Sequence, residues 1–139
     1  MTRKVHRRAA WRPRDGNHPA VVGRARTWAR RVLPRLLLSG PVRPDLDDDL
    51  DLVLSELVTN AIRHGGGCTR IELRAAGRLL RLSVTDARTS RPVVHLADRS
   101  SRESGRGMIL VQTIARRWGV RRVRQHRGKS VWLELVLNP

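Results

Sequence analysis

A long stripe of apolar side chains in residues 46–64 constrains the fold more than any other feature of this sequence. Apolar residues recur there every three or four positions, which predicts an amphipathic helix about five turns long. Aspartates crowd its start, where a helix dipole favours negative charge, and Arg63, His64 and three glycines close it. Such a stripe needs another layer to cover it. The apolar residues are Leu46, Leu50, Val53, Leu54, Leu57, Val58, Ala61 and Ile62.

Two polar residues lie at the edge of this stripe. Glu56 and Asn60 are one helical turn apart and therefore share a face. Most such pairs are simply a solvated face of a helix. A carboxylate that accepts a proton and an amide oxygen that binds a hard cation are also suitable chemistry for a Mg-nucleotide site. The second interpretation requires the rest of the chain to supply contacts for phosphate and for a base.

Charge limits the classes of partner. The 139 residues are the length of one domain, with a formal net charge of +17, and only Lys4 and Lys129 among the 29 basic residues are lysines. This balance predicts affinity for polyanions, although an arginine bias also arises from GC-rich coding. With one cysteine, Cys68, an internal disulfide is excluded. Without a signal peptide or an apolar run of membrane-spanning length, we expect a soluble, cytoplasmic protein with no membrane partner.

The start of the chain divides into an arm and a helix. Residues 1–19 are basic and interrupted by proline and glycine, so we assign them to an N-terminal arm, solvated or bound to nucleic acid, with a short edge strand near residues 9–12. Residues 20–139 form the main domain. Within it, residues 20–38 predict a helix that Pro34 kinks or ends.

After the three glycines the apolar period changes from 3.6 to 2. Residues 71–75 and 80–85 alternate around Gly77, which predicts an antiparallel hairpin with one buried face and with Asp86 at its end. A short extended run follows at 93–96, and then a loop at 97–104.

The remainder of the chain predicts one helix and two strands. Gly105 opens the helix, which carries Trp118 on its apolar face and ends at Gly119. The strands at 120–125 and 131–137 flank a turn at 126–129.

The stretch Gly105-Arg106-Gly107-Met108 is the candidate for phosphate binding. Glycines before a helix start let backbone N–H groups approach an anion that the helix dipole favours. A dinucleotide-binding fingerprint is excluded because Leu110 stands where its third glycine belongs. Gly128-Lys129-Ser130 imitates a P-loop, but Val123 replaces its leading glycine and the segment joins two strands. Arg106 is either a phosphate contact or a solvated side chain.

The order of these motifs is more specific than any one of them. Over about residues 20 to 137 the chain resembles the ATP-binding domain of the GHKL superfamily, which includes histidine kinases, gyrase and chaperones of the ninety-kilodalton class. It is most similar to small single-domain anti-sigma-factor serine kinases and their actinobacterial relatives. The motifs that carry this resemblance are Glu-Leu-Val-Thr-Asn-Ala at 56–61, His64-Gly65, Gly105-Arg106-Gly107-Met108 and Trp118-Gly119.

This resemblance implies a fold and a site. The fold is an α/β (α+β) two-layer sandwich whose mixed, mostly antiparallel sheet has about three helices on one face, so residues 20–139 would be an ATP-binding domain. ATP and Mg²⁺ are the implied cofactors. Asn60 matches the Mg²⁺ ligand, Glu56 the general base, and Asp86 the acceptor of the adenine amino group. The implied nucleotide-binding residues are Asn60, Asp86, Gly105, Arg106, Gly107, Met108 and Ser130.

The implied function is ATP-dependent regulation of the anti-sigma-factor type. Such a protein phosphorylates serine or threonine on an antagonist protein, sequesters a sigma factor, or does both, in some cases as a homodimer. The alternative is a catalytically inactive scaffold that acts on an acidic protein or nucleic acid through its basic surface; the presence of Glu56 favours the kinase. Two departures stand out. Arg88 follows Asp86-Ala87 where the family has glycine, and either weakens ATP binding or points to solvent. Pro34 alters a face that relatives use for partners.

Overall fold

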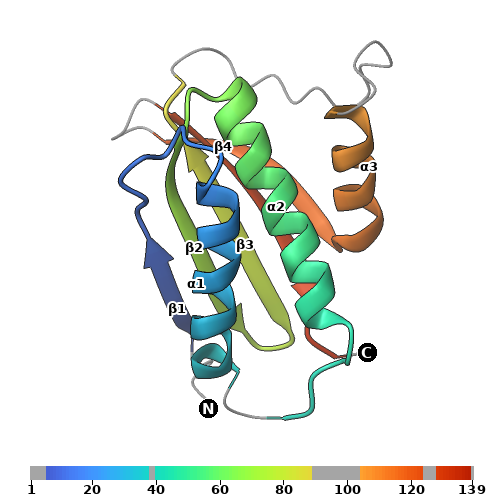
Figure 1. Cartoon of the computed structure of the whole chain (residues 1–139). Coiled ribbons are helices and arrows are strands. Elements are labelled where there is room, and N and C mark those ends of the chain that lie inside the picture. Colours follow the sequence, from blue (N-terminus) through green and yellow to red (C-terminus); the bar gives the residue numbers. More distant parts are fainter. Residues whose placement is uncertain (1–5, 38–39, 89–103, 124–127, 139) are drawn as a thin grey trace.

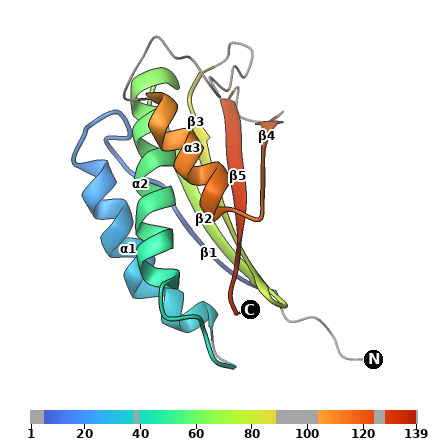
Figure 2. The ribbon, with the colours of Figure 1, turned by 90° about the vertical axis from the view of Figure 1, so that its right-hand side faces the viewer.

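The computed structural model describes residues 6–37, 40–88, 104–123 and 128–138. Three helices pack on one face of a five-stranded sheet, so that the molecule has two layers (Figures 1 and 2). This confirms the expected sandwich. The elements in chain order are β1 (Arg7–Trp11), α1 (Val21–Leu36), α2 (Leu46–His64), β2 (Cys68–Ala76), β3 (Leu79–Asp86), α3 (Ser104–Ile114), β4 (Arg117–Val123) and β5 (Gly128–Val136).

The sheet has the strand order β1-β2-β3-β5-β4, and each neighbouring pair is antiparallel. A mixed sheet was expected, but the described strands include no parallel pair. The predicted hairpin is confirmed as β2 and β3, with Leu73 opposite Leu82 and with Gly77 in the turn at a φ of 60°. The edge strand expected near residues 9–12 is β1, which pairs with β2.

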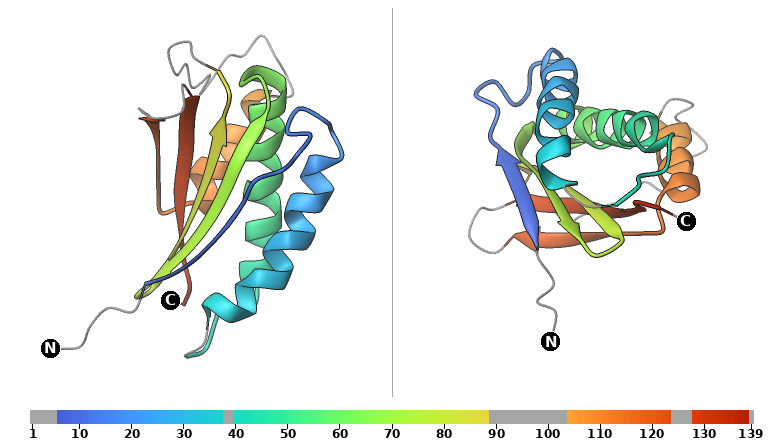
Figure 3. Two further views of the ribbon diagram at one scale, coloured as in Figure 1. Left: turned by 90° about the vertical axis from the view of Figure 1, so that its left-hand side faces the viewer. Right: turned by 90° about the horizontal axis from the view of Figure 1, so that it is seen from below.

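The central helix α2 has the bounds that its apolar stripe predicts. Its stripe packs over β2, β3 and β5, and α1 and α3 flank it (Figure 3). Arg43 fixes the start of this helix to the end of the sheet, because it donates from Nε to the carbonyl of Val136 at 2.7 Å and from a terminal nitrogen to Asp49 at 2.6 Å. The buried residues of the stripe are Leu46, Leu50, Val53, Leu54, Leu57, Val58 and Ala61.

Helix α1 continues through Pro34 and ends at Leu36, two residues later. In the middle of the helix, Trp28 stacks on Trp11 of β1 with ring centroids 6.2 Å apart. None of the helices in the described part of the chain is long and apolar enough to cross a membrane.

The end of α3 differs from the prediction. The helix ends at Ile114, and Trp118 and Gly119 belong to β4 rather than to the helix. The N–H of Arg116 already donates to the carbonyl of Glu134 at 2.8 Å, because pairing with β5 captures the chain at this point. Of the turn predicted at 126–129, residues 128 and 129 belong to β5 and the rest lie outside the described residues, as do the run at 93–96 and the loop at 97–103.

Candidate functional site

Asp86 ends β3 with its side chain on the same face as Leu82 and Val84, toward the helices. It is only 4% exposed. Its carboxylate accepts the backbone N–H of Arg88 at 3.1 Å and that of Lys129 at 3.4 Å, and it pairs with the ammonium group of Lys129. A buried carboxylate held in this way keeps a fixed orientation.

The glycines after α2 bring the end of that helix against Asp86. A Cβ built on Gly65 would lie 2.6 Å from the Asp86 Cγ, a distance that only glycine permits. The N–H of Ala87 donates to the carbonyls of Gly65 and Gly67, at 3.0 and 3.1 Å. Gly66 and Gly67 adopt φ values of 72° and 119°, the left-handed conformations expected where glycines close a helix. The ends of α2 and β3 are therefore locked together.

Glu56 lies on α2 against the first turn of α3. A Cβ built on Gly107 would lie 2.8 Å from the Glu56 Cδ and nearer still to Oε2, so the carboxylate contacts the glycine backbone itself. Burial raises the pKa of Glu56, and the positive charge of Arg63 opposes this increase. A carboxylate with a raised pKa is a stronger proton acceptor.

Asn60 lies one turn further along α2 and faces the next residue of α3. Its Nδ2 donates to Met108 Sδ at 3.4 Å, and Met108 is 4% exposed. This contact leaves the amide oxygen as an acceptor for a cation. Glu56, Asn60 and Gly65 thus follow the last turns of α2 over about 13 Å. Glu56 and Asn60 contact α3, and Gly65 contacts Asp86 at the end of β3.

The sequence was compared with models of known protein families. Residues 18–135 match the model of the histidine kinase-like ATPase domain. The chain belongs to the histidine kinase-like ATPase family. A search of curated proteins finds no match.

Membership of the histidine kinase-like ATPase family makes this an ATP-binding type of domain. The residues present suit such a ligand. Because Gly107 has no Cβ, the Glu56 carboxylate contacts the backbone of the first turn of α3, and a phosphate bound to this backbone would take the place of that carboxylate. Asn60 offers a hard oxygen ligand in the same interface between α2 and α3, because it contacts Met108, the residue that follows Gly107.

The other predicted nucleotide-binding residues lie in two different places, in α3 and on β5. Gly105 and Arg106 lie in the first turn of α3, and the Arg106 side chain is outside the described part of the structure. Ser130 is buried at 3% exposure, but it pairs with Thr85 on β3 and faces away from the helices. It is therefore on the opposite face of the sheet from the carboxylate of Asp86.

Two residues at this end of the domain were not among the predicted site residues. Lys129 lies on the inward face of β5 together with Val131 and Leu133. A lysine among inward-facing apolar residues indicates that a buried carboxylate lies close to it, here Asp86 of β3. Arg88 is exposed, but its guanidinium donates to the carbonyl of His64 at 2.6 Å. It therefore caps the end of α2, which neither alternative drawn from the sequence anticipated.

Proposed function

We propose that the chain binds Mg-ATP between α2 and the start of α3 and transfers its terminal phosphoryl group to a serine or threonine of a partner protein. The contact between the Glu56 carboxylate and the Gly107 backbone is the observation that carries this proposal. It joins a proton acceptor to a helix start suited to phosphate. A hydroxyl group bound next to this contact would lie near both the base and the phosphate.

In this proposal each residue has a separate task. Asn60 provides an oxygen ligand for Mg²⁺, which when bound neutralises charge on the phosphates. Backbone N–H groups around Gly107 hold the phosphate chain, and Asp86 accepts a hydrogen bond from the adenine amino group. Lys129 keeps the Asp86 carboxylate in place by pairing with it.

Glu56 acts as the general base in the proposed transfer. It accepts the proton of the attacking hydroxyl while the oxygen–phosphorus bond forms and the bond from the phosphoryl group to ADP breaks. Its raised pKa makes it a more effective acceptor than an ordinary glutamate. ADP and the phosphorylated partner leave, and Glu56 releases its proton to solvent.

The proposed partners are a sigma factor, the antagonist protein of an anti-sigma factor, or both. The motifs at 56–65 and 105–108 support this class of partner through their resemblance to anti-sigma-factor kinases. The net charge of +17 favours an acidic protein surface. An inactive scaffold that uses the same charge is the competing function, and the following experiment separates the two.

Turnover with water as the acceptor tests the role of Glu56 without a known partner. We expect Glu56→Gln to retain affinity for an ATP analogue and to lower ADP formation by on the order of 100-fold, because an amide cannot accept the proton. Asp47→Asn is the matched control: the same type of change, on the exposed start of α2, leaves turnover intact.

Two results would contradict the proposal. ADP formation by Glu56→Gln at the wild-type rate would remove Glu56 as the base. Binding of Mg-ATP by the wild type without any ADP formation above background would support the scaffold instead.

A further inference from the structure

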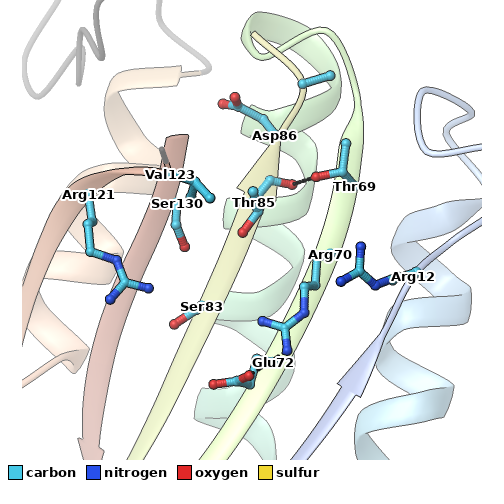
Figure 4. Close-up of a pocket in the computed structure, with 11 residues that line it drawn as sticks. Arg12, Thr69, Arg70, Glu72, Ser83, Thr85, Asp86, Arg121, Val123 and Ser130 are labelled. Carbon is cyan, nitrogen blue, oxygen red and sulfur yellow. Dashed lines mark hydrogen bonds and ion pairs between the residues drawn. The ribbon is translucent and has the colours of Figure 1, made fainter. Parts of the chain in front are cut away.

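The sheet face turned away from the helices carries a hollow of about 520 Å³ (Figure 4). Most of its lining comes from the solvent-side positions of the strands, as Arg70 and Glu72 show, since they alternate with Ile71 and Leu73 of the core. The hollow is therefore separated by the sheet from Glu56 and Gly107. Its charged lining consists of the arginines Arg12, Arg70 and Arg121 and the carboxylates Glu72 and Asp86. Hydroxyl groups of Thr69, Ser83, Thr85 and Ser130 lie among them.

Four of these side chains form one row across the sheet. Arg70 on β2 is opposite Thr85 on β3, Thr85 is opposite Ser130 on β5, and Ser130 is opposite Arg121 on β4. The row thus has an arginine at each end and two hydroxyl groups between. At about 4.8 Å per strand, its ends lie about 14 Å apart. Figure 4 shows Arg121 reaching inward from one side, with Arg12 and Arg70 on the other.

The hollow has more positive than negative charge. Glu72 pairs with Arg70 at 2.7 Å, and Lys129 pairs with Asp86, so these four charges cancel. Within the described part of the chain, Arg12 and Arg121 have no carboxylate partner. Two cations without counter-charges therefore border the same concave surface, together with hydroxyl donors. This arrangement attracts a compact anion.

We propose that this hollow binds the diphosphate group of a small molecule, on the face of the sheet opposite to Glu56 and Gly107, with Asp86 at the end of β3 bordering both sites. Guanidinium groups match phosphate oxygens in geometry as well as in charge, and the hydroxyl groups of Thr85 and Ser130 supply further donors between them. The volume is that of a small-ligand pocket. The span between Arg70 and Arg121 suits two linked phosphates better than one. The ligand is either free pyrophosphate or a nucleoside diphosphate, which share this chemistry.

Calorimetric titration of the full chain with inorganic pyrophosphate tests the site, with EDTA present to remove Mg²⁺ and about 0.15 M salt to screen diffuse attraction. We expect saturable binding that Arg121→Ala weakens on the order of tenfold. Arg122→Ala is the matched control, because it removes the same charge from the adjacent residue of β4, which faces the other way. Its affinity should stay near that of the wild type.

Ser130→Ala tests the row without changing any charge, and should also weaken pyrophosphate binding if the protein keeps its wild-type melting temperature. Uridine diphosphate distinguishes the two sources. If it binds more tightly than pyrophosphate and loses affinity in Arg121→Ala, the ligand is a nucleoside diphosphate; if it binds less tightly, the ligand is free pyrophosphate.

Equal weakening by Arg121→Ala and Arg122→Ala would show only general attraction to a basic protein and would overturn the proposal. So would the absence of saturable pyrophosphate binding by the wild type. Asn60→Ala should leave pyrophosphate affinity unchanged, which keeps this result independent of the Mg-ATP site.

Discussion

At the scale of single residues, the pair formed by Asp86 and Lys129 has the largest expected energetic effect. The side chains of Asp86 and Lys129 are 5% and 12% exposed, so water could not solvate either charge well if its partner were removed. We expect Asp86→Asn to lower the free energy of unfolding by about 3 kcal/mol, because it leaves the Lys129 ammonium buried without a counter-charge. Urea denaturation measures this loss.

The double variant Asp86→Asn, Lys129→Met serves as the control for that prediction. It removes both charges and puts an apolar chain of similar length in place of the lysine, so most of the lost stability should return. A double variant no more stable than Asp86→Asn alone would show that the pair does not account for the loss.

Glu56 gives a prediction for pH. A general base works when deprotonated, so ADP formation should fall as the pH drops through the pKa of Glu56. Because burial raises this pKa above its ordinary value of 4.5, the loss should occur at a higher pH than for an exposed glutamate. Arg63 lowers the pKa, so Arg63→Gln should move the acidic limb of the rate profile to still higher pH. If Arg63→Gln left the acidic limb of the rate profile at the same pH, the titration of Glu56 would not be its cause.

At the scale of elements, the contact between α2 and α3 depends on a glycine. Alanine in a helix normally stabilises it relative to glycine by about 0.5–1 kcal/mol. In Gly107→Ala the new Cβ would overlap the Glu56 carboxylate, so we expect lower thermal stability and weaker binding of an ATP analogue. Gly23→Ala in α1 is the control, because a Cβ there meets nothing within 4 Å and should raise stability. Equal stabilisation by both variants would contradict the close packing of Glu56.

Elements whose pattern is local were predictable. The stripe of α2 has a clear start and end, and the hairpin of β2 and β3 alternates around Gly77. The end of α3 was not predictable in this way, because Trp118 fits a helical stripe after Ile114 as well as it fits a strand. Pairing with β5 decides for the strand, and that long-range contact leaves no local signal.

The site was predictable to the extent that its residues lie in motifs. Glu56 and Asn60 share a face of one helix and Asp86 ends a hairpin, but only the resemblance to the GHKL superfamily assigned these residues to a nucleotide site, and that assignment stays a prediction. Lys129 was not assigned to the site because its role depends on which face of β5 it shares with the core. The position of Ser130 depends on the same alternation. It follows Lys129 on β5, so its side chain lies on the opposite face of the sheet.

At the scale of the whole molecule, the helices cover one face of the sheet and leave the other uncovered (Figure 3). On that open face Arg81 and Arg117 bind the buried carboxylate of Glu134, and Arg81 lies 4.3 Å from the Trp132 ring centroid. Burial alone would raise the pKa of Glu134, but hydrogen bonds from Arg117 and Arg81 together with their positive charges lower it. The two faces thus differ in chemistry, with the proposed Mg-ATP site on one and the proposed diphosphate site on the other.

The central claim is a Mg-ATP site between α2 and the start of α3. Titration with a fluorescent ATP analogue, with and without Mg²⁺, tests it most directly in the wild type and in Asn60→Ala. We predict saturable binding by the wild type that Mg²⁺ strengthens, and loss of that Mg²⁺ dependence in Asn60→Ala. Binding by Asn60→Ala that matches the wild type in both conditions, or no binding by the wild type, would contradict the account.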